Sequence, residues 1–323
     1  MKPRTSDQVV AYLRDAHAIE EQALAQLRMA PQISGTEALA ALFRDHLAET
    51  ELHERLIRTR LEEVGATPSA VKDSVMVVGG KVFVLFARLQ VDTPGKLVTH
   101  AYAYEHLEVA AYSLLGEVAE RTGDSATASI ARRIEEEERR MGERLAEHFS
   151  DSLEASIGDL DHAGLQEKLV SSLADAHALE TQSITLLERA PALVDDPALG
   201  EVFESHRAES ENHRAQIDRR LVALDNSASR LKDAALRLGG LNWSLYFQAQ
   251  PDTTGKLAAF AYAVEHLEIA GYAHLRGVAE RAGDKATIHT VDLIVADERA
   301  AASAIEAQFL RAAVISLGGP ARL

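Results

Sequence analysis

The segment YAYEHLEVAAYSLLGEVAERTGD, residues 102–124, decides the fold because it occurs twice. Residues 262–284 read YAVEHLEIAGYAHLRGVAERAGD, and 15 of the 23 positions are identical. The same offset of 160 residues relates DAHAIEEQ (15–22) to DAHALETQ (175–182) and DTPGKL (92–97) to DTTGKL (252–257) without a gap. The chain is therefore predicted to be a tandem duplication. We place the first domain at residues 1–157 and the second at residues 158–323.

Each copy predicts four long helices, which in the first copy cover residues 6–29, 36–65, 95–122 and 125–149. Gly- and Pro-containing segments separate them: APQISG, GATPS and RTGDS. The apolar residues 72–91 must return the chain along the bundle, so we expect a helical crossover with a break at Gly79-Gly80. Residues 150–164 are the expected linker. Four long helices with one long connection predict an all-α, ferritin-like four-helix bundle in each copy.

Composition excludes several classes of function. The formal net charge of −16 argues against a nucleic-acid partner, because phosphate contacts need a basic surface. The absence of cysteine excludes disulfides, thiolate metal sites and cysteine nucleophiles. The most apolar run, residues 75–89, is shorter than the ~20 residues that span a bilayer. The N-terminus becomes polar too early for a signal peptide, so we expect a cytoplasmic protein without a membrane partner.

A carboxylate stands near the middle of the predicted inward face of every helix. These residues are Glu20, Glu49, Glu108 and Glu138 in the first copy, and Glu180, Glu209, Glu268 and Glu298 in the second. An unpaired buried ion costs several kcal/mol, so four would consume a typical domain stability of about 5–15 kcal/mol. The inward faces offer only Arg60, or Arg220, as a cationic partner. Bound metal is the most economical explanation.

Carboxylate and imidazole without thiolate favour iron or manganese, with zinc also possible. Two cations could share the four carboxylates and two histidines of each copy. His53 follows Glu49 by one turn and is the predicted imidazole ligand, with His213 as its counterpart. We expect His46 and His206 to hydrogen-bond the ligands from outside. Tyr112 and Tyr272 either hydrogen-bond a ligand or are plain core residues.

The motifs DAHAIE, HLAETELHERL, EHLEVAAY and EEERRMGERLA resemble the YciE/YciF-type ferritin-like stress-protein family. The resemblance covers nearly all of each copy and implies a ferritin-like bundle with a dinuclear metal site. It adds Glu105 and Glu265 to the expected ligands, because Glu105-x-x-Glu108 and Glu265-x-x-Glu268 match the rubrerythrin-like spacing of the third helix.

Two features depart from the pattern of the wider superfamily. The second helix carries Glu49-x-x-x-His53, one residue longer than the usual Glu-x-x-His. The fourth helix has Met141, and Ala301 in the second copy, where a histidine is expected. A site poorer in histidine would bind metal more weakly or asymmetrically.

The expected function is a dinuclear metal protein with two ions per domain, iron first and manganese second. It would handle peroxide, oxygen or iron in stress protection, as a catalase-like, peroxidase-like or ferroxidase-like oxidoreductase. One alternative is a non-catalytic stress protein with a structural or vestigial metal site. Another is a di-iron oxygenase with an organic substrate. The apolar segments 72–91 and 232–251 further predict that the two copies pack as an internal pseudo-dimer, which could oligomerise further. The alternative is that each segment folds over its own bundle.

Overall fold

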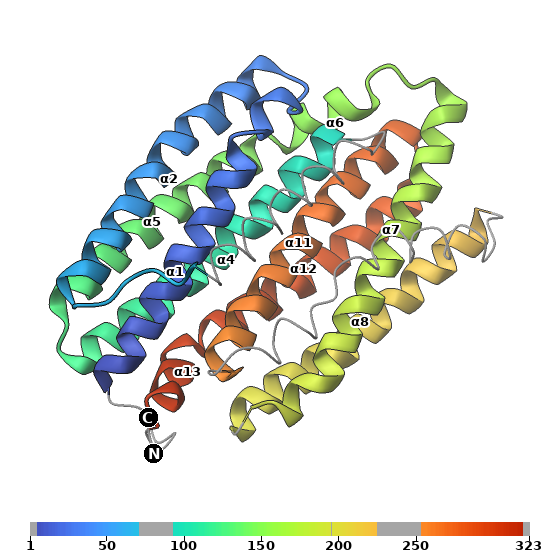
Figure 1. The fold of residues 1–323 in the computed structure, drawn as a ribbon. Helices are drawn as coiled ribbons and strands as arrows, with labels where there is room; N and C mark the ends of the chain where they lie inside the picture. The colour runs from blue at the N-terminus through green and yellow to red at the C-terminus, as the bar shows by residue number, and fades with distance from the viewer. Residues whose placement is uncertain (1–4, 71–92, 195, 225–252, 319–323) are drawn as a thin grey trace. The chain divides into compact units, whose positions relative to one another are not determined.

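The structure, a computed structural model, describes residues 5–70, 93–194, 196–224 and 253–318. All regular secondary structure in these ranges is helical (Figure 1). The chain divides into two compact units. Unit 1 comprises Met1–Ser156 together with Phe309–Leu323, and unit 2 comprises Ile157–Gln308. The predicted all-α class is confirmed.

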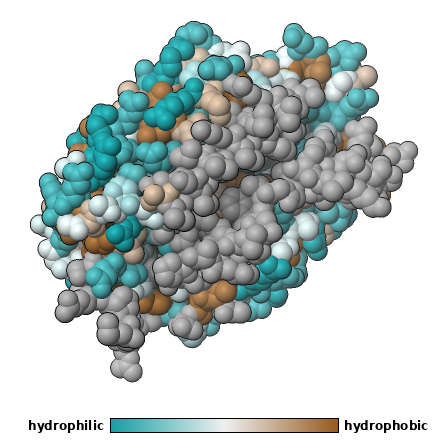
Figure 2. All heavy atoms as spheres, in the orientation of Figure 1, coloured by the Kyte–Doolittle hydropathy of each residue, from teal (hydrophilic) through white to brown (hydrophobic). Residues whose placement is uncertain are grey.

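Four long helices form the bundle of unit 1: α1 (Thr5–Leu27), α2 (Glu37–Glu63), α4 (Thr93–Thr122) and α5 (Ser125–Glu147). A short 3₁₀ turn, η1 (Ala30–Gln32), connects α1 to α2. α1 packs against α2 and α4, and α5 packs against the same two helices, so the four helices close around one core. Figure 2 shows mainly hydrophilic residues over the outward side of α2, as expected for an amphipathic helix.

Unit 2 repeats this arrangement with α7 (His162–Arg189), α8 (Pro197–Ala223), α11 (Thr253–Ala282) and α12 (Lys285–Glu306). The 3₁₀ turn η2 (Ala190–Ala192) takes the place of η1. α7 contacts α8 and α11, and α12 contacts the same pair. The four helices predicted for each copy are therefore present in both units.

Capping residues explain where several of these helices begin. The side chains of Thr36, Asp124, Asp161, Asp196 and Asp284 each accept a hydrogen bond from a backbone N–H in the first turn of α2, α5, α7, α8 and α12. α4 ends at Gly123, whose φ of 81° is a conformation that glycine adopts without a Cβ penalty. The N–H of Asp124 then reaches Ala119 O at 2.8 Å, which closes the α4–α5 turn.

The predicted linker over residues 150–164 is wrong in its first half. Residues Phe149–Ile157 form a further helix, α6, with Ile157 buried. Phe149, Leu153 and Ile157 follow one another at intervals of four residues, so they share one apolar face. The polar composition of the segment concealed that face.

The C-terminal helix α13 (Phe309–Ser316) differs from its expected place in the second domain. It belongs to unit 1, where it packs against α4. The hydroxyl of Ser316 lies 3.0 Å from the hydroxyl of Tyr12 in α1. Phe309, Ala312 and Ala313 are buried. The break between the units at Ser156 and Ile157 lies one residue from the expected boundary.

The crossover segments 72–91 and 232–251, and the internal pseudo-dimer predicted from them, lie outside the described residues. No described helix combines the length and apolar character needed to cross a membrane.

Candidate metal centre

Two histidines of α2 enter the core of unit 1. His46 and His53 are seven residues apart, which is about 700° of helix rotation, so they project from nearly the same side. Their exposed fractions are 1% and 0%. Such burial requires polar partners on the facing helices.

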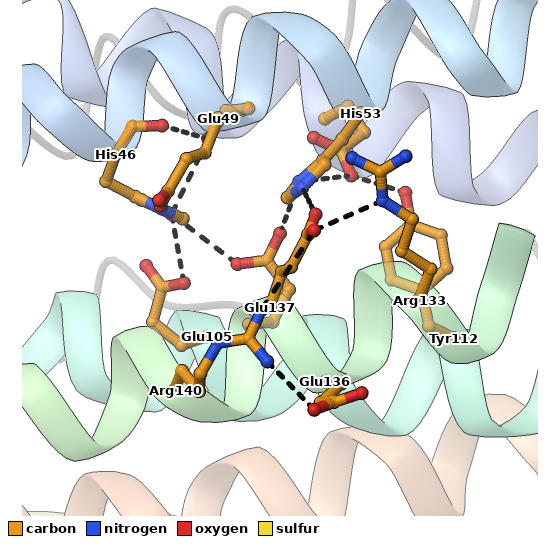
Figure 3. Close-up of polar contacts among 12 residues, drawn as sticks. His46, Glu49, His53, Glu105, Tyr112, Arg133, Glu136, Glu137 and Arg140 are labelled. Carbon is orange, nitrogen blue, oxygen red and sulfur yellow. Dashed lines mark hydrogen bonds and ion pairs between the residues drawn. The ribbon is translucent and has the colours of Figure 1, made fainter.

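His46 faces a group of three carboxylates. Its Nε2 lies 3.1 Å from Glu105 Oε2 of α4 and 3.5 Å from Glu138 Oε2 of α5 (Figure 3). Glu108 lies one turn after Glu105 and completes the group. One potential ligand atom from each of these four buried residues lies within 4.8 Å of all the others.

His53 faces a second group that overlaps the first. Its Nδ1 lies 2.7 Å from Glu138 Oε1 and 3.9 Å from Glu20 Oε1 of α1. Glu138 therefore offers Oε2 toward His46 and Oε1 toward His53. All four helices of the bundle contribute to the combined cluster, and Glu138 belongs to both groups.

Three further side chains orient the cluster from outside. The Nδ1 of His46 lies 3.2 Å from Glu49 Oε2, and the Nε2 of His53 lies 2.7 Å from Glu137 Oε2 (Figure 3). The buried Tyr112 hydroxyl donates a hydrogen bond to Glu20 Oε1. Each imidazole thus has one nitrogen toward the cluster and the other against a carboxylate, the arrangement that orients histidine ligands in metal sites.

Unit 2 contains the same two overlapping groups. They comprise His206, Glu265, Glu268 and Glu298, and Glu180, His213 and Glu298. The Tyr272 hydroxyl donates to Glu180 Oε1 at 2.5 Å. The outer carboxylates are Glu209, 3.4 Å from His206 Nδ1, and Asp297, 3.2 Å from His213 Nε2.

Burial and mutual charge shift the titration of this cluster. Burial raises the pKa of Glu20 to about 8 and that of Glu105 to about 7. Burial, reinforced by the charge of Glu138, holds the pKa of Glu108 well above its usual range. Burial lowers the pKa of His53, but its contacts with Glu138 and Glu20 outweigh this and raise the pKa to about 9. Without a cation, protons and histidine–carboxylate pairs must stabilise the cluster.

The residues present fit a metal centre. Among the described residues, neither carboxylate oxygen of Glu108 has a hydrogen-bond partner, and neither does Glu20 Oε2. A buried polar group without a partner costs about 1–3 kcal/mol, and more when it is charged. A cation bound by these oxygens and the two imidazoles would remove that cost.

We expected Glu49 inside the cluster and His46 outside it, and the structure shows the reverse. The same holds for their counterparts Glu209 and His206. The Glu49 side chain is 46% exposed and lies outside the cluster, whereas His46 lies inside it. The buried residues Leu39, His46, Thr50, His53 and Ile57 define the inward side of α2. Glu49 is rotated from that direction by about 70°. The sequence register was wrong because it placed Arg60 on the inward face, whereas Arg60 is only partly buried.

The other expected ligands of unit 1 are brought together: Glu20, His53, Glu105, Glu108 and Glu138. In unit 2 these are Glu180, His213, Glu265, Glu268 and Glu298. Tyr112 and Tyr272 were predicted either to hydrogen-bond a ligand or to be plain core residues. The structure shows the hydrogen bonds, to Glu20 and Glu180 respectively. Both histidines of each cluster come from one helix, α2 or α8, so the cluster contains two imidazoles although Met141 and Ala301 replace the expected histidine on the fourth helix.

Glu137 and Asp297 were missed by the sequence analysis. Each directly precedes the shared carboxylate, so about 100° of helix rotation points it away from the core. In unit 1, the packing of α2 against α5 brings the outer nitrogen of His53 within reach of Glu137. In unit 2, the packing of α8 against α12 brings His213 within reach of Asp297. The signal available in the sequence was that both copies have a second carboxylate directly before the inward-facing one.

A third group, His17, Glu21 and Glu54, lies between α1 and α2. His17 Nε2 is 3.2 Å from Glu54 Oε1, and Arg58 Nε is 3.4 Å from the same oxygen. We interpret this group as an ion-pair network, because the guanidinium already supplies the positive charge.

Fold and site together define a class: an all-α tandem protein in which each four-helix bundle encloses a buried histidine–carboxylate cluster that could hold metal. Residues 5–157 and 164–314 both match the family described as a domain of unknown function, DUF892. The chain belongs to that family, and the two matches establish the tandem duplication. No solved structure matches the chain significantly.

Proposed function

We propose that each unit is a ferritin-like dinuclear carboxylate centre for iron or manganese, acting on peroxide, oxygen or iron in stress protection. The observation that carries this proposal is the pair of overlapping ligand groups joined by Glu138, and by Glu298 in unit 2. Contributions from all four helices are the arrangement found in ferritin-like metal centres. The resemblance to the YciE/YciF-type proteins supports the same assignment.

The protein residues would supply position and charge. Tyr112 fixes one oxygen of Glu20 and leaves the other free for a cation. Glu49 and Glu137 hold the two imidazoles with one nitrogen toward the centre. Two iron or manganese ions held there would supply redox chemistry toward peroxide or oxygen.

A small cavity among the described residues reaches the cluster. It has a volume of about 20 Å³, reaches Glu105, and is otherwise lined mainly by apolar residues of α1, α2 and α4. That volume is close to what a single water needs. Peroxide and oxygen are small molecules of this order of size, so the cavity is compatible with either as substrate.

Metal content is the direct test. Protein expressed with iron or with manganese should contain up to two metal ions per unit, measured by elemental analysis after desalting. Glu138→Ala removes the shared ligand of unit 1 and should halve the content, and adding Glu298→Ala should abolish it. Glu136→Ala is the matched control, because its side chain is 75% exposed and unit 2 already has Ala296 at this position.

Less than one ion per chain under both conditions would contradict the proposal. If metal binds, peroxide consumption and oxygen uptake by the loaded protein separate an oxidoreductase from a protein with a structural metal. Loss of turnover in the Glu138→Ala, Glu298→Ala variant, with turnover retained in Glu136→Ala, would assign activity to the centres.

A further inference from the structure

The two units differ in the residues around their outer carboxylates. These are Glu49 and Glu137 in unit 1, and Glu209 and Asp297 in unit 2. On α5, Arg133 Nε lies 3.1 Å from Glu137 Oε1, and Arg140 Nη2 lies 4.0 Å from the same oxygen (Figure 3). Arg144 Nη1 lies 3.9 Å from Glu49 Oε2. The two outer carboxylates of unit 1 are therefore backed by three arginines of one helix.

Unit 2 has no guanidinium group at any of the three corresponding positions. Leu293, Ala300 and Ala304 occupy the corresponding positions of α12. Among the described residues, the ion pairs of Asp297 and Glu209 are with His213 and His206 alone. Leu293 is 50% exposed, so a side chain that could hold Asp297 has been replaced by one without a polar group.

The contacts between the outer carboxylates and the histidines are also shorter in unit 1 than in unit 2. Glu137 lies 2.7 Å from His53 Nε2, whereas Asp297, one methylene shorter, lies 3.2 Å from His213 Nε2. Glu49 lies 3.2 Å from His46, and Glu209 lies 3.4 Å from His206. The Glu137 side chain is 21% exposed and that of Asp297 is 52% exposed. The outer carboxylates of unit 1 are thus closer to their histidines, and Glu137 is better shielded.

We propose that Arg133, assisted by Arg140, is a positioning residue that holds Glu137 against His53 and makes the unit 1 centre the tighter metal site of the two. The inference rests on the proposed metal-binding function and deepens it, because it assigns different affinities to the two centres. Arg133 acts through Glu137 and touches no member of the cluster directly.

Two effects of the arginines oppose each other. Their positive charge disfavours a nearby cation, but Arg133 and Arg140 are about half exposed and well screened. Exposed charge pairs of this kind change an equilibrium by about two- to fivefold. Loss of a carboxylate that orients a ligating histidine typically costs about 10- to 100-fold in metal affinity. Unit 2 retains Asp297, so only part of this effect separates the two centres; the remainder still exceeds the repulsion, and we expect unit 1 to bind metal more tightly by up to about tenfold.

Each centre can be measured alone in the full-length chain. Glu298→Ala leaves the unit 1 centre to bind, and Glu138→Ala leaves the unit 2 centre. Mn²⁺ is the probe, and equilibrium dialysis with detection of free Mn²⁺ by electron paramagnetic resonance gives the dissociation constant. In the Glu298→Ala background, Arg133→Ala with Arg140→Ala should weaken binding about five- to tenfold. Arg132→Ala is the matched control, because Arg132 pairs with Glu120 instead.

A double-mutant cycle tests whether Arg133 acts through Glu137. Glu137→Ala should weaken binding by itself, and Arg133→Ala should then no longer weaken it; relief of charge repulsion leaves at most a small tightening. Conversely, Leu293→Arg with Asp297→Glu in the Glu138→Ala background should tighten the unit 2 centre. Thermal unfolding of the metal-free variants gives an independent check that the bundles remain folded.

Equal dissociation constants for the two centres, or tighter binding by unit 2, would overturn the inference while leaving the proposed function intact. So would a weakening by Arg133→Ala that persists after Glu137→Ala. If neither background bound Mn²⁺ or Fe²⁺, the proposed function would fail, and this inference with it.

Discussion

At the scale of single residues, Glu108 shows how function and stability compete in this core. Its carboxylate is buried, neither oxygen has a hydrogen-bond partner among the described residues, and its pKa is raised by burial and by Glu138. A residue placed only for stability would be apolar here. Leu13, fully buried on α1, is such a residue.

Replacing Glu108 should therefore stabilise the metal-free protein. We expect Glu108→Met, which preserves volume, to raise the free energy of unfolding of unit 1 by about 1–3 kcal/mol and to weaken metal binding there. Leu13→Ala should instead cost about 2–5 kcal/mol, because it opens a cavity. Urea denaturation of the metal-free proteins measures both. A loss of stability in Glu108→Met would mean that the carboxylate has a stabilising partner.

At the scale of helices, glycine sets how closely α4 and α5 approach beside the cluster. A Cβ on Gly142 of α5 would lie 2.9 Å from His106 Cε1 of α4. The His106 ring is held by a hydrogen bond of 2.7 Å from its Nδ1 to Tyr102 O, and it packs on the Tyr102 ring at 4.4 Å between centroids. A Cβ on Gly116 of α4 would meet Ala131 Cβ at an ordinary 3.7 Å.

The two glycines should therefore respond oppositely to alanine. Gly116→Ala should stabilise unit 1 by about 0.5–1 kcal/mol, because alanine is the better helix former. Gly142→Ala gains the same helix propensity, but the new methyl group overpacks against His106 at a cost of about 1–3 kcal/mol. We therefore expect a net loss of stability. Thermal unfolding of the two single variants measures the difference. If His106→Ala failed to relieve the loss in Gly142→Ala, the steric explanation would be wrong.

At the scale of the whole molecule, the clusters predict a stability that depends on pH and on metal. The pKa of Glu20 is about 8 and that of His53 about 9 in unit 1, and the pKa of Glu298 is about 8 and that of His206 about 10 in unit 2. All four values exceed the ordinary ones of 4.5 and 6.5. The folded state therefore binds protons more tightly than the unfolded state, and the stabilisation is lost as pH rises through these values.

Metal-free protein should accordingly unfold at a lower temperature at pH 9 than at pH 6. Manganese should restore the loss, because bound cations take over the role of the protons, and its stabilising effect should increase with pH. Differential scanning calorimetry at several pH values, with and without Mn²⁺, measures this. The Glu138→Ala, Glu298→Ala variant is the control in which the metal effect should disappear. A metal-free protein that became more stable between pH 6 and pH 9 would contradict the assigned titration.

The sequence by itself determined the duplication, the four helices of each copy, and most of the cluster. Glu20, Glu105, Glu108 and Glu138 could be found because each helix shows a helical apolar period, and the family spacing added Glu105 to the inward carboxylates.

Only the tertiary structure decided that His46 enters the cluster in place of Glu49, that Glu137 holds His53, and that α13 packs in unit 1. The rotation of α2 about its axis is set by its packing against α1 and α5, and apolar residues on more than one side of the helix leave that rotation open within about 60–70°. Likewise, α13 follows α12 of unit 2 in sequence, and a short amphipathic helix does not specify from its own pattern which bundle will cover its apolar side.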